Sequence, residues 1–156
     1  MAHDKSLFLV DAFALIFRAH FAFAKSPRIT STGLNTSAVF GFTTTLMEVL
    51  TKEKPSHLGV AFDTSAPTFR HQLFDQYKAQ RDETPEDIKI AVPYVKRMLQ
   101  AMAIPILEVD GFEADDVIGT LALKAGEAGY QAYMMPPDKD YAQLVRPNVC
   151  LYRPAS

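Results

Sequence analysis

The sequence contains one cysteine, Cys150, and no tryptophan among its 156 residues. A single cysteine cannot form an intrachain disulfide, which excludes a disulfide-stabilised scaffold and a cysteine-cluster zinc site and is typical of a reducing compartment. An excess of charge of one sign is also absent, because 16 Lys and Arg stand against 18 Asp and Glu. Apolar residues make up 48% of the chain and charged residues 22%, which indicates a soluble globular domain rather than a disordered chain.

Long hydrophobic runs are absent as well. The most apolar stretch, residues 7–24, resembles a signal peptide that ends in Ala22-Phe23-Ala24, but Asp11, Arg18 and His20 interrupt it and no basic run precedes it. The remaining apolar runs are far shorter than the ~20 residues of a membrane-spanning helix. We therefore expect neither secretion nor membrane insertion.

Short apolar segments with strand character alternate with segments of helical periodicity. Alternation of this kind predicts an α/β fold with a mostly parallel central sheet and helices on both faces. The strands are nearly continuous apolar runs, as expected of strands covered on both sides. The predicted strands are 7–11, 57–63, 104–109, 130–135 and 148–152; the predicted helices are 12–23, 38–52, 85–102, 111–129 and 140–145.

Acidic residues follow four of the predicted strands. In parallel sheets the carboxyl ends of the strands lie on one edge, where ligands collect, so these carboxylates are expected to lie together. Hard oxygen ligands without His or Cys suit Mg²⁺ or Mn²⁺ rather than Zn²⁺, and bound cations would relieve the mutual repulsion of the acids. The seven acids are Asp11, Asp63, Glu113, Asp115, Asp116, Asp138 and Asp140.

A structural alternative exists for each acid taken singly. An Asp at the end of a strand is often a helix cap, and acids at 113–116 could stabilise the first turn of a helix. The coincidence of four separate groups on one predicted edge favours the metal site. Without the seven acids the chain has 16 basic against 11 acidic residues, so the remaining surface is basic.

Residues 68–81 combine basic and aromatic side chains. Arg70, Lys78 and Arg81 stand against one acid, Asp75, and aromatic side chains are interleaved with them. Basic side chains suit contact with a phosphate backbone, and aromatic side chains suit stacking on unpaired nucleobases. The alternative is an ordinary amphipathic helix face.

The motifs together resemble the 5′-nuclease domain at the N-terminus of bacterial DNA polymerase I, in the flap-endonuclease branch of the PIN-like nucleases. The most specific stretches are GFEADDVIGTLA (111–122) and DKDYAQLV (138–145). GLNTSAVFGF (33–42) and AFDTSAPTFRHQLFDQYKAQRDETPED (61–87) extend the resemblance over nearly the whole chain. This sequence differs from the family at two places. Ala12-Phe13 stands where the family often has Gly-Asn, and Pro136-Pro137 stands where it often has a small residue followed by Gly.

The resemblance implies a 5′–3′ exonuclease and flap endonuclease that uses two or more Mg²⁺ or Mn²⁺ ions on DNA with a 5′ flap or single-stranded 5′ end and on RNA primers. It implies that the seven acids are the metal site, with Asp11, Asp63, Asp116 and Asp138 catalytic. Lys78 and Arg81 would be catalytic and bind substrate, together with Arg18, Arg70 and Tyr77. Residues 64–83 would form an arch that is mobile without DNA.

The resemblance also implies a bacterial, cytoplasmic, nucleoid-associated protein of DNA replication and repair. Residues 1–156 would be its catalytic lobe, without the helix-hairpin-helix region and the covalently joined polymerase domain that follow in the family. Two alternatives remain open. One is a phosphoryl-transfer domain of the receiver or phosphatase type, although Asp11 is followed by Ala12-Phe13 rather than by a second acid. The other is a DNA-binding fragment without catalytic activity.

Overall fold

The structure, a computed structural model, describes residues 5–64, 68, 73, 84–136 and 138–154. Within these residues it contains strands, α-helices and one 3-10 helix, and at least one helix lies between each strand and the next. In chain order the elements are β1 (Ser6–Asp11), α1 (Ala12–Ala22), α2 (Ser37–Lys52), β2 (His57–Ala61), α4 (Glu86–Ala101), β3 (Ile106–Leu107), α5 (Ala114–Glu127), β4 (Gln131–Met135), the 3-10 helix η1 (Lys139–Leu144) and β5 (Val149–Leu151).

The five strands form one sheet in the order β3-β2-β1-β4-β5, and every neighbouring pair is parallel. The central strand β1 pairs Leu9 with Gly59 of β2 on one side and with Met134 of β4 on the other. Parallel neighbours need crossover connections, which the helices supply. The carboxyl ends of β1, β2 and β4 therefore lie at the same edge of the sheet.

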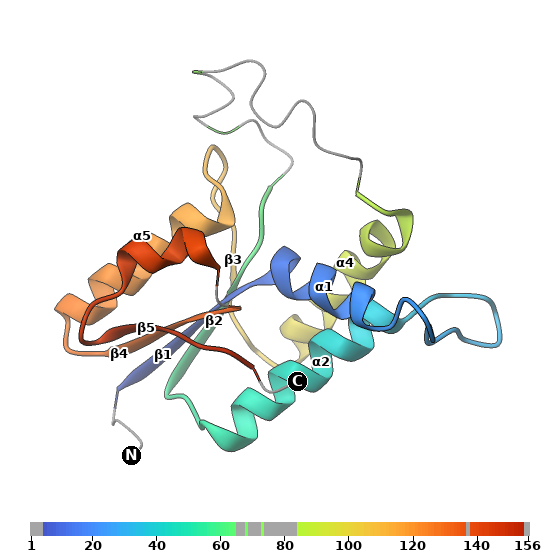
Figure 1. Cartoon of the computed structure of the whole chain (residues 1–156), viewed down its shortest axis with the longest axis horizontal. Coiled ribbons are helices and arrows are strands. Elements are labelled where there is room, and N and C mark those ends of the chain that lie inside the picture. Colours follow the sequence, from blue (N-terminus) through green and yellow to red (C-terminus); the bar gives the residue numbers. More distant parts are fainter. Residues whose placement is uncertain (1–4, 65–67, 69–72, 74–83, 137, 155–156) are drawn as a thin grey trace.

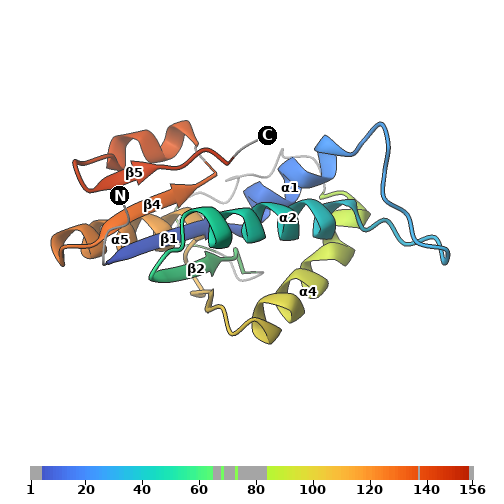
Figure 2. The same ribbon diagram turned by 90° about the horizontal axis from the view of Figure 1, so that it is seen from below.

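Alternate residues of β1 point into two separate hydrophobic cores. Phe8 and Val10 pack into the larger core with α1, α2 and α4, whereas Leu9 packs into a second core with α5. Figures 1 and 2 show α5 on one side of the sheet and α1, α2 and α4 on the opposite side. The predicted α/β fold, with helices on both faces of a parallel sheet, is confirmed.

Helices α1 and α2 approach each other closely because Gly41 has no side chain. A Cβ atom at Gly41 would lie 2.6 Å from the Cβ of Ala19, which is closer than two carbon atoms can pack. The small residues thus allow α2 to lie against α1, whose first residue follows Asp11 directly. This packing fixes the direction in which α1 leaves the sheet.

The predicted strand 104–109 is wrong in extent, because β3 contains only Ile106 and Leu107. Pro105 has no N–H to donate, although its carbonyl accepts a hydrogen bond from the Val60 N–H at 3.0 Å. As an edge strand β3 pairs only with β2, so little holds its flanks extended. The predicted strand 57–63 likewise ends at Ala61, and the predicted helix 140–145 is the 3-10 helix η1.

Within the described residues no helix combines the length and apolarity needed to cross a bilayer. The segment 64–83, predicted to form a mobile arch, lies outside the described residues except for Thr64, Thr68 and Leu73.

Candidate metal centre and active site

Six of the seven predicted acids line one cavity at the carboxyl edge of the sheet. They come from the end of β1, the segment after β2, the start of α5 and the start of η1. The cavity has a volume of about 340 Å³, room for roughly ten waters at about 30 Å³ each. Its acidic lining residues are Asp11, Asp63, Glu113, Asp115, Asp138 and Asp140.

Asp11 is held on both carboxylate oxygens. Oδ1 accepts the Ala14 N–H at 3.2 Å, which makes Asp11 the N-cap of α1, and Oδ2 accepts the Tyr141 hydroxyl at 3.1 Å. The pKa of Asp11 is raised from 3.8 to about 6, chiefly by burial and also by the negative charges of Asp63 and Asp115, against the lowering effect of the two hydrogen bonds. A half-buried carboxylate among like charges is an environment that favours a bound cation.

Asp63 connects β2 to the helix that carries three other acids. Its Oδ1 accepts the Ala114 N–H at 2.7 Å, at the first turn of α5. The α5 N-terminus is closed further by a capping box, in which Asp116 Oδ2 accepts the Glu113 N–H at 3.0 Å and the Glu113 side chain accepts the N–H of Asp116. The capping interpretation and the clustering are therefore both observed at these residues.

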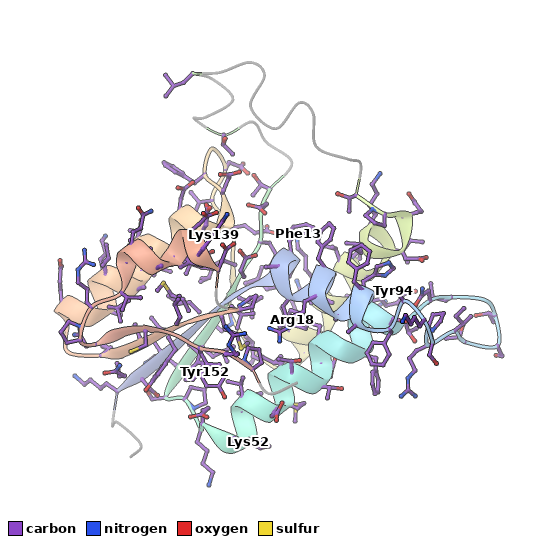
Figure 3. The ribbon with its side chains drawn as sticks, viewed as in Figure 1. Phe13, Arg18, Lys52, Tyr94, Lys139 and Tyr152 are labelled. Carbon is purple, nitrogen blue, oxygen red and sulfur yellow. The ribbon has the colours of Figure 1, made fainter. Side chains whose placement is uncertain are left out.

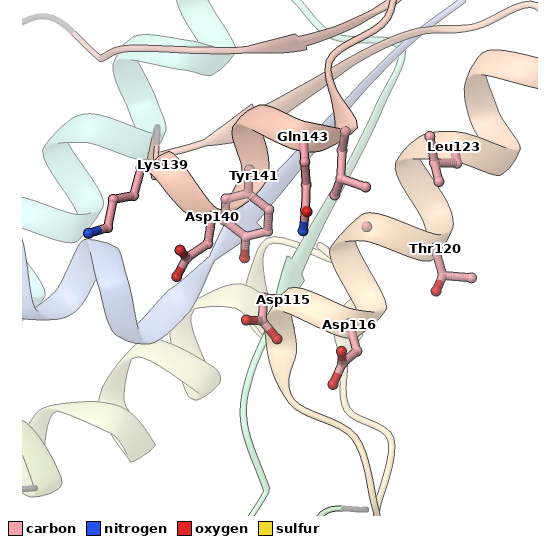
Figure 4. Close-up of a pocket in the computed structure, with 10 residues that line it drawn as sticks. Asp115, Asp116, Thr120, Leu123, Lys139, Asp140, Tyr141 and Gln143 are labelled. Carbon is pink, nitrogen blue, oxygen red and sulfur yellow. The ribbon is translucent and has the colours of Figure 1, made fainter. Parts of the chain in front are cut away.

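Glu113, Asp115 and Asp116 can offer one carboxylate oxygen each within 4.8 Å of one another. Glu113 is buried, with 5% of its surface exposed, which is unusual for a charged side chain. Asp116 does not line the six-acid cavity but an adjoining one between α5 and η1. Figure 4 shows Asp115 and Asp116 projecting from α5 on one side of that space and Asp140 and Tyr141 projecting from η1 on the other.

The last two acids belong to a tight turn after β4. Asp138 is the N-cap of η1, and its Oδ1 accepts the Asp140 N–H at 3.0 Å. The Tyr141 N–H donates to the Asp138 carbonyl at 3.0 Å. The turn therefore sets the position of both carboxylates and of the Tyr141 ring together.

The donor set fits a hard divalent cation. The acidic side chains of the cavity offer only carboxylate oxygens, and neither His nor Cys lines it among the described residues. Several of the oxygens already accept backbone N–H groups, so the carboxylates are oriented before a ligand binds. The raised pKa of Asp11 has the sign expected where positive charge is needed to balance crowded acids.

The predicted basic residues are not brought to this cavity within the described part of the chain. Arg18 is exposed and lies on the side of α1 that faces α2, where it lines a different groove with Thr44 and Glu48 (Figure 3). The other predicted substrate-binding residues, Arg70, Tyr77, Lys78 and Arg81, lie outside the described residues.

Three residues that line these cavities were missed by the sequence reasoning. Phe13 and Phe17 of α1 form an apolar wall of the acid cavity, and Phe13 packs edge-to-face against Phe62. Tyr141 is 3% exposed and its phenol has a pKa raised by burial and by Asp11, so it stays protonated and donates. Its position one residue after Asp140 was the available signal, since a buried tyrosine hydroxyl usually needs a partner.

This chain is similar to a known protein family and to several known proteins. Residues 6–156 match the family described as 5′-3′ exonuclease, N-terminal resolvase-like domain. DNA polymerase I of Synechocystis sp. is 43% identical over 150 residues, which cover 94% of this chain and 15% of that protein. The 5′-3′ exonuclease of Aquifex aeolicus is 39% identical over 150 residues, which cover 96% of this chain and 51% of that protein.

Among solved structures, a bacteriophage T5 flap endonuclease in a pseudo-enzyme-product complex with DNA and metal ions superposes with a TM-score of 0.69 at 21% identity. The superposition covers 96% of this chain and 55% of the phage protein, and at that identity it supports the fold alone. The match to the family extends from the first strand to the last residue of the chain. The chain belongs to the N-terminal resolvase-like domain family of 5′-3′ exonucleases.

Proposed function

We propose that this domain hydrolyses phosphodiester bonds at the 5′ ends of DNA strands, including 5′ flaps, and of RNA primers, with Mg²⁺ or Mn²⁺ as cofactor. The observation that carries the proposal is the cavity at the carboxyl edge of the sheet, lined by six carboxylates. Supporting it are the family membership and the relatives named 5′-3′ exonuclease and DNA polymerase I.

The acids would hold the cations. Asp11 and Asp63 enter the cavity from the sheet, each with one oxygen fixed by a helix N-terminus. Glu113 and Asp115 enter from the start of α5, and Asp138 and Asp140 enter from the start of η1. Asp116 lines the adjoining cavity and can offer one oxygen within 4.8 Å of those of Glu113 and Asp115. When bound, divalent cations supply the Lewis acidity that activates water and balances charge on phosphate oxygens. In this proposal the acids position the cations and do not act as covalent nucleophiles.

The substrate strand would be held by basic residues outside the cavity. Lys78 and Arg81 are proposed to neutralise the scissile phosphate, with Tyr77 stacking on an unpaired base and Arg70 and Arg18 binding phosphates farther along the strand. The proposal extends to a duplex-binding region and a polymerase joined downstream, since the chain spans 15% of the length of Synechocystis DNA polymerase I. A site of action on the bacterial nucleoid follows from the same proposal.

The test is cleavage of a 5′-labelled flap substrate by the chain in the presence of Mn²⁺, with EDTA as the metal-free control. We expect cleavage near the base of the flap, and no cleavage of a covalently closed DNA, which has no 5′ end. Binding without cleavage would contradict the nuclease proposal and favour a DNA-binding role. A trapped phosphoaspartyl adduct would instead favour a phosphoryl-transfer domain.

Lys78→Ala tests the proposed substrate contact. We expect weaker binding of the flap, with the salt dependence of binding reduced by about one phosphate contact, and slower single-turnover cleavage, on the order of 10²-fold. The matched control is Lys124→Ala, which removes an exposed lysine from the last turn of α5, the end of the helix opposite the acids. Equal rates for the two variants would remove Lys78 from the site.

A further inference from the structure

The buried hydroxyl of Tyr141 has one partner within the described residues, and that partner is an acid of the proposed metal site. The ring belongs to the hydrophobic core between the sheet and α5, together with Leu9, Ile118 and Met134. Its hydroxyl leaves that core at the acid cavity and donates to Asp11 Oδ2 at 3.1 Å. The side chain is thus anchored by packing at one end and bonded to a carboxylate at the other.

This bond leaves Asp11 with little rotational freedom. The Ala14 N–H holds Oδ1 and the Tyr141 hydroxyl holds Oδ2, and the two donors come from different elements, α1 and η1. Each carboxylate oxygen can accept more than one hydrogen bond or cation contact, so both remain able to face the cavity. A carboxylate fixed in this manner is oriented before the cation arrives.

The backbone and the side chain of Tyr141 together connect two parts of the acid cavity. Tyr141 follows Asp140 directly, and its N–H donates to the Asp138 carbonyl at 3.0 Å. Its ring and hydroxyl then reach across to Asp11 at the end of β1. The positions of Asp138 and Asp140 relative to Asp11 are therefore set by one rigid aromatic side chain.

We infer that Tyr141 is a positioning residue for the metal site, which orients the Asp11 carboxylate and sets its distance from Asp138 and Asp140. The inference rests on the proposed function insofar as it concerns cations. It makes Tyr141 neither a metal ligand nor a group that touches substrate. Partners that orient a metal-binding carboxylate typically contribute 10- to 100-fold to metal affinity or activity.

Tyr141→Phe removes the hydroxyl and keeps the ring in the core. We expect the Mn²⁺ dissociation constant, measured by electron paramagnetic resonance, to rise on the order of tenfold. We expect kcat for flap cleavage to fall with KM for DNA unchanged. The matched control is Tyr152→Phe, which removes a hydroxyl that donates to Glu53 Oε1 at 3.0 Å, away from the acids. An Mn²⁺ affinity of Tyr141→Phe within twofold of that of the control would overturn the inference.

A cycle with Asp11→Asn separates positioning from packing. If the hydroxyl acts through Asp11, Tyr141→Phe should weaken Mn²⁺ binding in the wild-type background and add little in the Asp11→Asn background. If Tyr141 only fills the core, the loss on Tyr141→Phe should be the same in both backgrounds, which would overturn the inference.

A metal-free measurement keeps the inference separate from the proposed function. In chains with ¹³C-labelled aspartate and EDTA present, Tyr141→Phe should shift the Asp11 carboxyl signal more than that of any other aspartate, and Tyr152→Phe should not shift it. An unchanged Asp11 signal would overturn the inference. A wild-type chain that shows this shift but binds no Mn²⁺ would support the positioning of Asp11 and contradict the metal-dependent function.

Discussion

The two ends of the sheet satisfy their polar groups in opposite ways. At the amino end, Ser6 and Ser56 exchange hydrogen bonds: each hydroxyl accepts the other's N–H, at 2.8 and 3.0 Å, and the Ser56 hydroxyl also donates to the Ser6 carbonyl. At the carboxyl end, six acidic side chains line the same cavity, and no basic side chain among the described residues lines it with them. The first arrangement is closed and neutral, whereas the second is stabilised only in part by backbone N–H groups. The comparison indicates that the amino end serves stability and that the carboxyl end has a charge to be balanced by a ligand.

Asp138→Ala should have the largest effect, because it removes a carboxylate from the unbalanced end. We expect single-turnover cleavage of a flap to fall on the order of 10³-fold, about 4 kcal/mol of transition-state stabilisation. Flap binding should be retained or tighter, since one negative charge near the phosphates disappears. Parallel measurement of cleavage and of binding by fluorescence anisotropy checks this, and a variant that cleaves at the wild-type rate would contradict the assignment of Asp138.

Addition of Mn²⁺ should raise the free energy of unfolding by binding to the acids at the carboxyl end. A ligand that binds only the folded state adds about 2.7 kcal/mol to the free energy of unfolding at a hundredfold excess over Kd. Urea unfolding with and without Mn²⁺ measures the gain, and Asp11→Asn should lose most of it. A gain with Zn²⁺ but none with Mn²⁺ would be evidence against a site of hard oxygen ligands.

Ser56→Ala, at the amino end, should lower the stability of the chain without affecting the binding of Mn²⁺. It removes the hydroxyl that accepts the Ser6 N–H, and Ser6 is 7% exposed, so a nearly buried donor loses its partner. We expect the free energy of unfolding to fall by about 1 to 3 kcal/mol, with the gain from Mn²⁺ unchanged. The exposed Ser31→Ala serves as the control, and a Ser56→Ala chain with altered Mn²⁺ affinity would show that the two ends are not independent.

Acidification should stabilise the metal-free chain through Asp11. Its folded-state pKa is raised from 3.8 to about 6, so the folded state binds the proton more tightly than the unfolded state. The stabilisation is therefore present below about pH 4 and is lost as the pH rises through 6. Between pH 7 and pH 5 we expect a gain of about 1 kcal/mol in EDTA.

Asp11→Asn is the control for that pH dependence. Asparagine remains a good N-cap for α1 and does not titrate, so the variant should be more stable than wild type at pH 7 and should lack this part of the pH dependence. Equal slopes of stability against pH for the two chains would contradict the raised pKa of Asp11. This is the smallest of the expected effects.

Much of this fold could be predicted from the sequence because its strands are buried on both faces. Such strands read as apolar runs, and β1, β2, β4 and β5 were found within two residues of their predicted ends. The edge strand β3 was overestimated, since its length depends on pairing with β2 and on the missing N–H of Pro105 rather than on local composition. The helices α1, α2, α4 and α5 lie within three residues of their predicted ends, and α1 and α5 also have side-chain caps.

The acid cavity could be predicted in outline because parallel strands bring their carboxyl ends together. Which acids face the same cavity could not be predicted, because that depends on how α5 and η1 pack. Asp116 lines the adjoining cavity instead. Tyr141 was missed because a hydrogen bond to Asp11, 130 residues away in sequence, leaves no local pattern.

That bond also has a consequence for the order of folding. A contact between residues 130 positions apart closes almost the whole chain into one loop, and contacts of such high sequence separation generally slow folding. The orientation of Asp11 thus depends on β4 pairing with β1 and on η1 docking after it. We expect the ability to bind a cation to be gained late during refolding, after the apolar cores have formed. In a stopped-flow experiment, the Mn²⁺ signal would then record the final docking step rather than the collapse of the chain.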